Sequence, residues 1–176
     1  MTQPHPDDDP SVEDAEWLYR RIPSRQARFD DNRGERWPSS ASMCPSSGDD
    51  DVSVYIGSLL NDPLDVLDQH PTHGLVRFRA GTVRAAGAAC GAALGIVRDP
   101  ITDAERPLRC DPAHALIRGV PPGSKRSRTV ARELVYETDM EWVVRPPADA
   151  DTRQASATNQ EDLPADGADR DDRKEL

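Results

Sequence analysis

Apolar and polar residues alternate in several short segments between residues 11 and 147. Residues 52–56 (VSVYI) place their three aliphatic side chains on one face, which is the two-residue period of a β-strand. Residues 75–79 alternate in the same way. Strands are also predicted over 94–97 and 113–117, with a helix as the alternative for the last segment. The middle of the chain is therefore expected to form a small sheet of short strands.

Two short helices are predicted beside these strands. Ser11 opens a capping-box-like segment for a helix that runs to about Arg20, and Pro23 ends it. Asp62 followed by Pro63 is typical of a helix N-terminus, because the acidic side chain caps the first turn and proline fits its first position.

The Ala- and Gly-rich residues that follow 75–79 predict a thin helix. Residues 75–97 would then form a compact strand–helix–strand unit. Residues 30–51 are rich in Pro, Ser, Gly, Asn and Asp and are expected to form one long loop.

The longest helix is predicted over residues 127–144, where Leu134, Val135 and Trp142 share one stripe at helical spacing. The predicted fold class is α+β. One small domain covers residues 11–147, and its short-stranded sheet carries a single long C-terminal helix.

Acidic residues concentrate at the two ends of the chain. The 176 residues include 32 acidic and 22 basic side chains, which gives a net charge of −10. Residues 1–10 contribute −3 and residues 148–176 contribute −5. Segments of this composition bury too little apolar surface to offset the cost of ordering the backbone, about 1–2 kcal/mol per residue. Both segments are predicted to be disordered acidic tails.

Composition limits the class of protein. No stretch of about 20 apolar residues is present, so no membrane contact is expected. The N-terminus has neither a basic start nor an apolar run, and three cysteines are an odd number for an exported disulfide scaffold. The abundance of Arg and Ala is typical of a GC-rich bacterial genome. We expect a bacterial cytoplasmic protein whose acidic charge disfavours non-specific nucleic-acid binding.

Arginine and aromatic residues are interleaved between residues 17 and 37. This combination is typical of protein interfaces, and it also suits phosphate contacts with base stacking. The alternative is that the aromatic residues pack in the core and the arginines form intramolecular pairs. The candidate interface residues are Trp17, Tyr19, Arg20, Arg21, Arg25, Arg28 and Trp37.

A second basic stretch holds Lys125, Arg126 and Arg128 at the predicted start of the longest helix. Helix N-termini attract anions through their free N–H groups, so this stretch is a candidate anion site. The alternative is a solvated basic loop paired with acidic residues.

Two short pairs could contribute to a zinc site, namely His70 with His73 and Cys110 with His114. We expect no metal, because residues 74–109 include a unit that can fold on apolar contacts. The chain has no G-x-G-x-x-G, no complete phosphate loop and no G-x-S-x-G. No cofactor and no serine-hydrolase triad are therefore predicted.

Three short motifs resemble the opening of the RES-type ADP-ribosyltransferase-like toxins. They are L-Y-R at 18–20, G-E-R-W at 34–37 and V-Y-I at 54–56. That family has an Arg near its start, a G-G-R-W-N loop, and then a strand followed by a helix with a Glu. In this chain Glu35 and Pro38 replace the second Gly and the Asn of the loop.

The resemblance implies a nucleotide-using transferase with Arg20, Arg36 and Tyr55 lining its pocket. It covers residues 18–70 only, and residues 59–70 offer aspartates where the family has its Glu.

Three functions follow from these observations. The first is a non-catalytic binding or accessory protein that contacts a protein partner through residues 17–37. The second is the nucleotide-using transferase that the resemblance implies. The third is a weak nucleic-acid binder that uses the two Arg-rich stretches.

Overall fold

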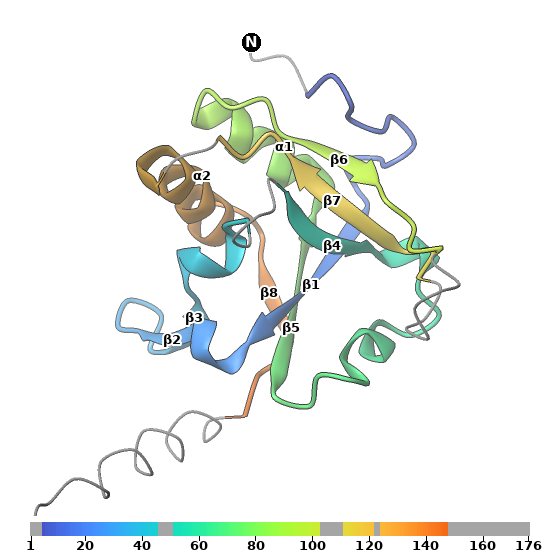
Figure 1. Cartoon of the computed structure of the whole chain (residues 1–176). Coiled ribbons are helices and arrows are strands. Elements are labelled where there is room, and N and C mark those ends of the chain that lie inside the picture. The colour runs from blue at the N-terminus through green and yellow to red at the C-terminus, as the bar shows by residue number, and fades with distance from the viewer. Residues whose placement is uncertain (1–4, 46–50, 103–110, 122–123, 148–176) are drawn as a thin grey trace, which may run out of the picture.

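The computed structural model describes residues 5–45, 51–102, 111–121 and 124–147. Its main element is a six-stranded antiparallel sheet with the strand order β6-β7-β4-β1-β5-β8 (Figure 1). The strands are β1 (Trp17–Pro23), β4 (Val52–Ile56), β5 (His73–Arg79), β6 (Gly95–Arg98), β7 (His114–Arg118) and β8 (Glu141–Val144). A separate hairpin joins β2 (Ala27–Asp30) to β3 (Glu35–Pro38).

Alternate positions along the strands pack into two apolar clusters, one on each face of the sheet. The larger cluster includes Leu18, Val54 and Phe78, which pack with α1 (Ala80–Ala89) and α2 (Ser124–Tyr136). The smaller cluster is centred on Tyr19, Tyr55, Val66 and Leu75. Four short 3-10 helices complete the described part, namely η1 (Ser24–Gln26), η2 (Ser40–Met43), η3 (Gly57–Leu59) and η4 (Pro63–Leu67).

The predicted fold class is wrong in its main feature, since the described residues contain no long C-terminal helix packed on a short-stranded sheet. The helix predicted over 127–144 is α2, and it ends at Tyr136. Thr138 closes its last turn by donating its hydroxyl to the Leu134 carbonyl at 2.7 Å. The following Glu-Trp-Val-Val is rich in strand-forming residues and pairs with β5 as the edge strand β8.

The N-terminal helix predicted over 11–20 is also wrong. Ser11 bonds the Asp9 carboxylate through both its N–H and its hydroxyl, at 2.8 and 2.7 Å, instead of capping a helix. The chain is extended from Trp17, because β1 pairs along its whole length with β5. Tertiary pairing has overridden a weak local helix signal here.

Residues 5–10 were expected to belong to a disordered tail, yet they contact the domain. The Asp8 carboxylate accepts hydrogen bonds from the Arg84 guanidinium at 2.9 Å and from the Ile96 N–H at 2.7 Å. The Asp9 N–H donates to the Ile96 carbonyl at 2.9 Å, so this segment covers part of the edge strand β6 (Figure 1). The predicted C-terminal tail, residues 148–176, lies outside the described residues.

Several local predictions are confirmed. Residues 52–56 and 75–79 are strands, and Asp62 caps η4 by accepting the Leu64 N–H at 2.9 Å. The segment 75–97 is a strand, a helix and a strand, but β5 and β6 are separated by three strands in the sheet. Residues 30–51 hold β3 and η2, where one long loop was expected.

At Gly74 on β5 the edge strand β8 and the residues after it pack closely against the backbone. A Cβ at this position would lie 2.6 Å from both Trp142 Cζ3 and Pro146 Cδ, and 2.8 Å from the Val144 carbonyl oxygen. We expect Gly74→Ala to lower the free energy of unfolding by about 1–3 kcal/mol through overpacking. Urea unfolding followed by Trp fluorescence measures this, and an unchanged midpoint would contradict the described packing of β8.

Candidate functional site

The strands β1 and β4 pair at only two positions, Leu18 with Ile56 and Tyr19 with Tyr55. Beyond Tyr19 they diverge, although β1 remains paired with β5 and β4 with β7. The Arg20 side chain lies where they separate. Its Nε donates to the Ser42 carbonyl at 2.7 Å, and its Nη1 donates to the Ser53 carbonyl on β4. The Arg20 side chain therefore gives the Ser53 carbonyl of β4 a hydrogen bond at a position where β1 and β4 are no longer paired.

Within the described residues, Arg20 is a charged group without a carboxylate partner. Its bonds within the described part of the chain go to backbone carbonyls, and no described Asp or Glu forms an ion pair with it. Burial, reinforced by the neighbouring Arg21 charge, lowers the pKa of Arg20 to about 10. The side chain is still protonated at neutral pH. Its Nη2 donors and remaining Nη1 hydrogen are available to an anion.

A pocket of about 260 Å³ opens over Arg20. Three arginines and two histidines line it together with small and polar residues, and none of the described lining residues is acidic. The lining comes from β1, η1, η2, β4 and the start of β5, with its neighbouring loops. The residues are Arg20, Arg21, Pro23, Arg25, Gln26, Ala41, Cys44, Pro45, Ser53, Tyr55, His70 and His73.

The two histidines of this pocket lie side by side, with ring centroids 4.8 Å apart. Partial burial lowers the pKa of His70, and the Arg21 charge lowers it further. The pKa of His73 is lowered by burial and by the charges of His70, Arg21 and Arg25. Both rings are therefore neutral at pH 7, and each would gain a proton more readily beside a bound anion.

The four residues of the alternative zinc site are not assembled as that hypothesis requires. His70 and His73 are adjacent, whereas His114 is bonded to Ser53 and to Asp99. Cys110 lies outside the described residues. No group of three or more His, Cys, Asp or Glu among the residues described here could hold a metal ion.

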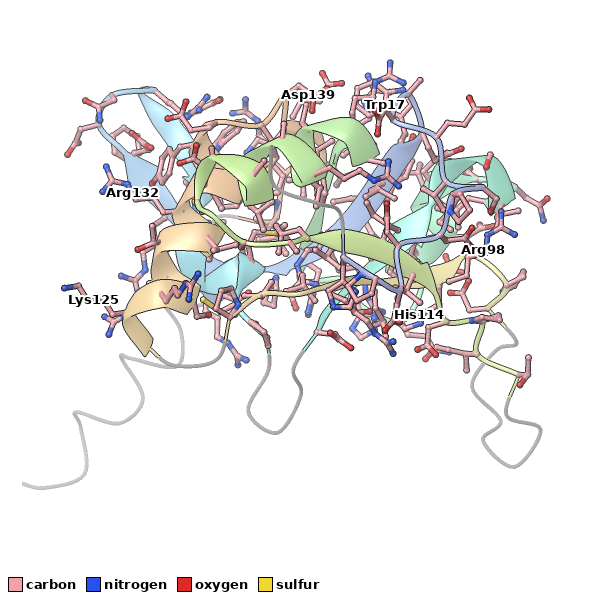
Figure 2. The ribbon with its side chains drawn as sticks, turned by 90° about the horizontal axis from the view of Figure 1, so that it is seen from above. Trp17, Arg98, His114, Lys125, Arg132 and Asp139 are labelled. Carbon is pink, nitrogen blue, oxygen red and sulfur yellow. The ribbon has the colours of Figure 1, made fainter. Side chains whose placement is uncertain are left out.

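The residues of the predicted 17–37 interface do not form one surface. Tyr19 and Trp37 are buried, and Trp17 is covered by the guanidinium groups of Arg77 and Arg79, 4.5 and 3.5 Å from its ring centroid. Arg20, Arg21 and Arg25 line the pocket. Arg28 and Trp37 line a separate groove, and Figure 2 shows Trp17 far from Arg132 of that groove.

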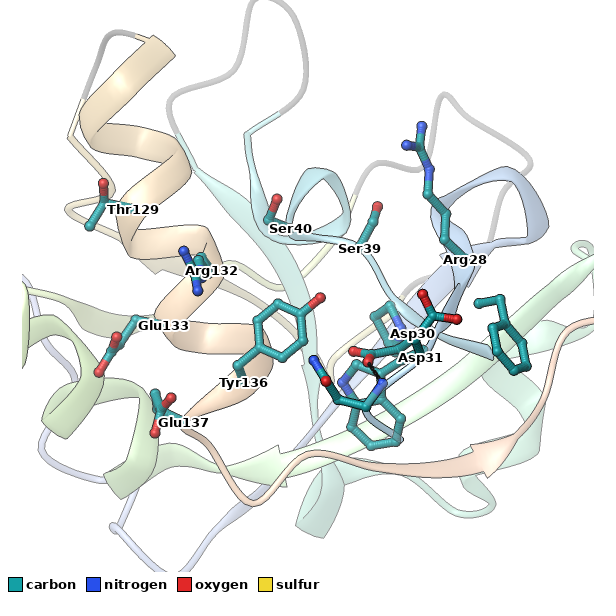
Figure 3. Close-up of a pocket in the computed structure, with 14 residues that line it drawn as sticks. Arg28, Asp30, Asp31, Ser39, Ser40, Thr129, Arg132, Glu133, Tyr136 and Glu137 are labelled. Carbon is teal, nitrogen blue, oxygen red and sulfur yellow. Dashed lines mark hydrogen bonds between the residues drawn. The ribbon is translucent and has the colours of Figure 1, made fainter. Parts of the chain in front are cut away.

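That second cavity, the hairpin–α2 groove, lies between the β2–β3 hairpin and α2 (Figure 3) and has a volume of about 940 Å³. Phe29 and Tyr136 on its walls are 65% and 39% exposed. Four acidic residues and two arginines line it. The charged lining residues are Arg28, Asp30, Asp31, Arg132, Glu133 and Glu137.

Arg36 does not join Arg20 and Tyr55, as the RES resemblance implied. Its Nε donates to the Ala27 carbonyl at 3.1 Å and its Nη2 to the Ser24 carbonyl at 2.9 Å. Arg36 therefore ties η1 to the hairpin. Of the three residues that the resemblance names, Arg20 and Tyr55 line the pocket.

The second basic stretch is separate from the pocket. Lys125, Arg126 and Arg128 are exposed in the first turns of α2, and Arg126 donates to the Gly91 carbonyl at 3.3 Å. Figure 2 shows Lys125 well away from His114, which is hydrogen-bonded to the pocket residue Ser53. Sequence analysis paired His70 with His73, but no local motif joins this pair to Ser53 or Arg20.

Comparisons of the chain with protein-family models, with curated proteins and with solved structures find no significant match. No helix within the described ranges is long and apolar enough to cross a membrane. The function must therefore be argued from the pocket itself.

Proposed function

We propose that this protein binds a small phosphate-bearing ligand in the pocket over Arg20. The proposal rests on the half-buried Arg20 guanidinium, which is charged and has no described carboxylate partner. An anionic ligand would supply the missing charge, and phosphate accepts a planar pair of N–H donors with good geometry. Arg21 and Arg25 add positive charge, and no described lining residue is an acid that opposes it.

The pocket size limits the ligand. Small-molecule sites span roughly 300–1,000 Å³, so a volume of about 260 Å³ fits a phosphate with a modest organic group. A nucleotide is the class that the RES resemblance suggests. The geometry does not favour the transferase chemistry of that family, because no described lining residue carries a carboxylate and Arg36 is engaged elsewhere.

Thermal unfolding of the full chain tests the proposal with inorganic phosphate, pyrophosphate, AMP and ADP as probes. A ligand that binds only the folded state raises the melting temperature in proportion to RT ln(1 + [L]/Kd). We expect a rise that grows with the logarithm of the probe concentration for at least one phosphate probe, and none with sodium chloride at equal ionic strength. No rise with any probe would contradict the proposal.

The two histidines predict a pH dependence of anion binding. Sulfate is a suitable probe, because it stays a dianion over the range used. His70 and His73 have pKa values below the ordinary 6.5 in the free pocket and are neutral above it. As pH falls below 6.5 they take up protons, so sulfate should bind more tightly, by up to about tenfold per pH unit for each proton taken up.

The control for this prediction is the double variant His70→Asn, His73→Asn. It should bind sulfate at neutral pH and lose the strengthening at low pH. Equal pH dependence of sulfate binding in the variant and in the wild-type protein would show that the two histidines do not contribute to the anion site.

A second candidate function is protein binding at the hairpin–α2 groove, favoured by the exposed Phe29 and Tyr136. Because acidic residues outnumber arginines in its lining, the partner segment should carry an apolar anchor flanked by basic residues. Selection of displayed peptides on the wild-type protein should enrich such sequences. Peptide binding should be lost in the double variant Phe29→Ala, Tyr136→Ala and kept in Arg20→Lys. Peptides that bind the double variant and Arg20→Lys equally well would contradict this second function.

A further inference from the structure

Ser53, His114 and Asp99 form a hydrogen-bonded chain that ends at the pocket. Ser53 lies on β4, His114 on the adjacent β7, and Asp99 directly after β6. The Ser53 Oγ is 2.7 Å from His114 Nε2. His114 Nδ1 is 2.7 Å from the Asp99 backbone oxygen and 3.3 Å from its carboxylate Oδ2. Three consecutive strands of the sheet thus bring together residues that are far apart in sequence.

The partners of His114 determine where its proton lies. A backbone carbonyl oxygen can only accept a hydrogen bond, so Nδ1 must carry hydrogen to bond the Asp99 oxygen. In the neutral ring Nε2 then has a free lone pair, and the Ser53 hydroxyl donates to it. This is the arrangement in which an imidazole can remove the proton of a serine hydroxyl.

The surroundings of His114 hold this arrangement in place. The ring is buried and packs edge-on against Tyr55, with centroids 5.9 Å apart. The Asp99 N–H donates back to the His114 carbonyl at 3.1 Å, which fixes the main chain that supplies the Nδ1 acceptor. Asp99 and His114 therefore hold each other at two points.

Ser53 connects this chain to the anion site. Its side chain lines the same pocket as Arg20, Arg21 and the two histidines. Arg20 Nη1 donates to the carbonyl of Ser53 itself, which places the guanidinium beside this residue. A phosphate held by Arg20 would lie next to an activated hydroxyl.

We infer that Ser53 is a nucleophile for phosphoryl transfer, with His114 as its general base and Arg20 as the group that stabilises charge on the phosphoryl oxygens. This inference rests on the proposed function. The Ser53 oxygen forms a bond to phosphorus, its proton passes to His114 Nε2, and the bond from phosphorus to the leaving oxygen breaks. The leaving group departs with that electron pair.

Water completes the cycle. It attacks the phosphoserine, the bond from phosphorus to the Ser53 oxygen breaks, and His114 returns its proton to that oxygen. The products of the two steps are the leaving-group anion and dihydrogen phosphate, and Ser53 and His114 regain their starting state.

The pocket also limits the leaving group. In-line attack places the leaving oxygen opposite Ser53, away from His114. Among the described lining residues, His70 and His73 are the candidate acids, and the lowered pKa of each in the free pocket disfavours its acid form. This favours a substrate that releases a stable anion without protonation. A phosphoanhydride or an aryl phosphate meets this requirement, whereas an ordinary alkyl phosphate does not.

The test uses 4-nitrophenyl phosphate with the full-length protein, measuring release of 4-nitrophenolate and, after acid quenching, the site of phosphorylation by mass spectrometry. We expect phosphate on Ser53 in the wild-type protein and none in Ser53→Ala. His114→Gln should slow the release at least about 100-fold, the lower bound for loss of a general base. Ser58→Ala, an exposed serine on η3, is the matched control and should behave as wild type.

Asp99→Asn gives a finer test. The nearer acceptor of His114 Nδ1–H is the Asp99 backbone oxygen, which this variant retains. The release rate should therefore fall by less than about tenfold, well short of the loss expected for removing the base itself. A loss as large as that of His114→Gln would show that the carboxylate, and not the carbonyl, orients the imidazole.

Sulfate binding separates the failure of this inference from the failure of the proposed function. Ser53→Ala and His114→Gln should still bind sulfate, which also shows that they are folded. Two results would contradict the role of Ser53 as nucleophile and leave the anion site unaffected. In the first, the wild-type protein binds sulfate but never carries phosphate on Ser53. In the second, Ser53→Ala releases 4-nitrophenolate at the wild-type rate. If the wild-type protein does not bind sulfate, both are overturned.

Discussion

Phe78→Ala is expected to lower the free energy of unfolding by about 3–5 kcal/mol, the range for removing a fully buried phenylalanine. Phe78 is completely buried on β5, opposite Leu18 of the central strand β1, and it faces the cluster shared with α1 and α2. The cavity left by its ring would open between the sheet and the helices. A loss of this size is a large fraction of the stability of a small domain.

Chemical denaturation with circular dichroism measures the effect. Phe29→Ala is the matched control, because Phe29 is 65% exposed and its removal should change the free energy of unfolding by less than about 0.5 kcal/mol. Similar midpoints for the two variants would show that β5 is not packed against the helices as described.

Arg20→Met should abolish anion binding and also destabilise the fold. It removes the guanidinium that lies where β1 and β4 diverge, and it leaves the carbonyls of Ser42 and Ser53 without this donor. An unsatisfied buried acceptor costs about 1–3 kcal/mol. Arg20→Lys separates the two effects, since it keeps the charge and loses the fork of N–H donors.

We expect Arg20→Lys to remain folded and to bind pyrophosphate about 10- to 100-fold more weakly. Hydrogen bonds to charged groups are worth about 1.5–3 kcal/mol each, and every 1.4 kcal/mol is a factor of ten in Kd. Calorimetric titration gives the Kd, and circular dichroism checks the fold. Unchanged affinity in a folded Arg20→Lys protein would mean that the ligand does not contact this guanidinium.

The sequence predicted elements where the local pattern and the tertiary environment agree. The alternation of residues 52–56 predicted a strand, and the structure has one there. Asp62 caps the turn that it was predicted to cap. The prediction was wrong where they compete. Trp142 fits a helical stripe with Leu134, yet it lies on the edge strand β8. Its indole N–H donates a hydrogen bond of 2.9 Å to the Arg36 carbonyl.

The site was less accessible to sequence analysis than the fold. Arg20 and Tyr55 could be named because a resemblance pointed to them. Ser53 and Asp99 could not be named, and His114 was named only as a possible zinc ligand. Strand order alone brings the three together, and that order depends on pairings between distant segments. The absence of G-x-S-x-G excludes one way of building a serine nucleophile, but it does not exclude a cross-strand arrangement.

Calorimetric titration of pyrophosphate at neutral pH measures whether the pocket over Arg20 binds a phosphate-bearing anion. Three proteins are compared, namely wild type, Arg20→Lys and Arg132→Lys, the last being an exposed arginine in the hairpin–α2 groove. We predict saturable binding at one site per chain in wild type and in Arg132→Lys, and binding at least about tenfold weaker in Arg20→Lys. No saturable heat in the wild-type protein, or weakening by Arg132→Lys alone, would contradict the claim.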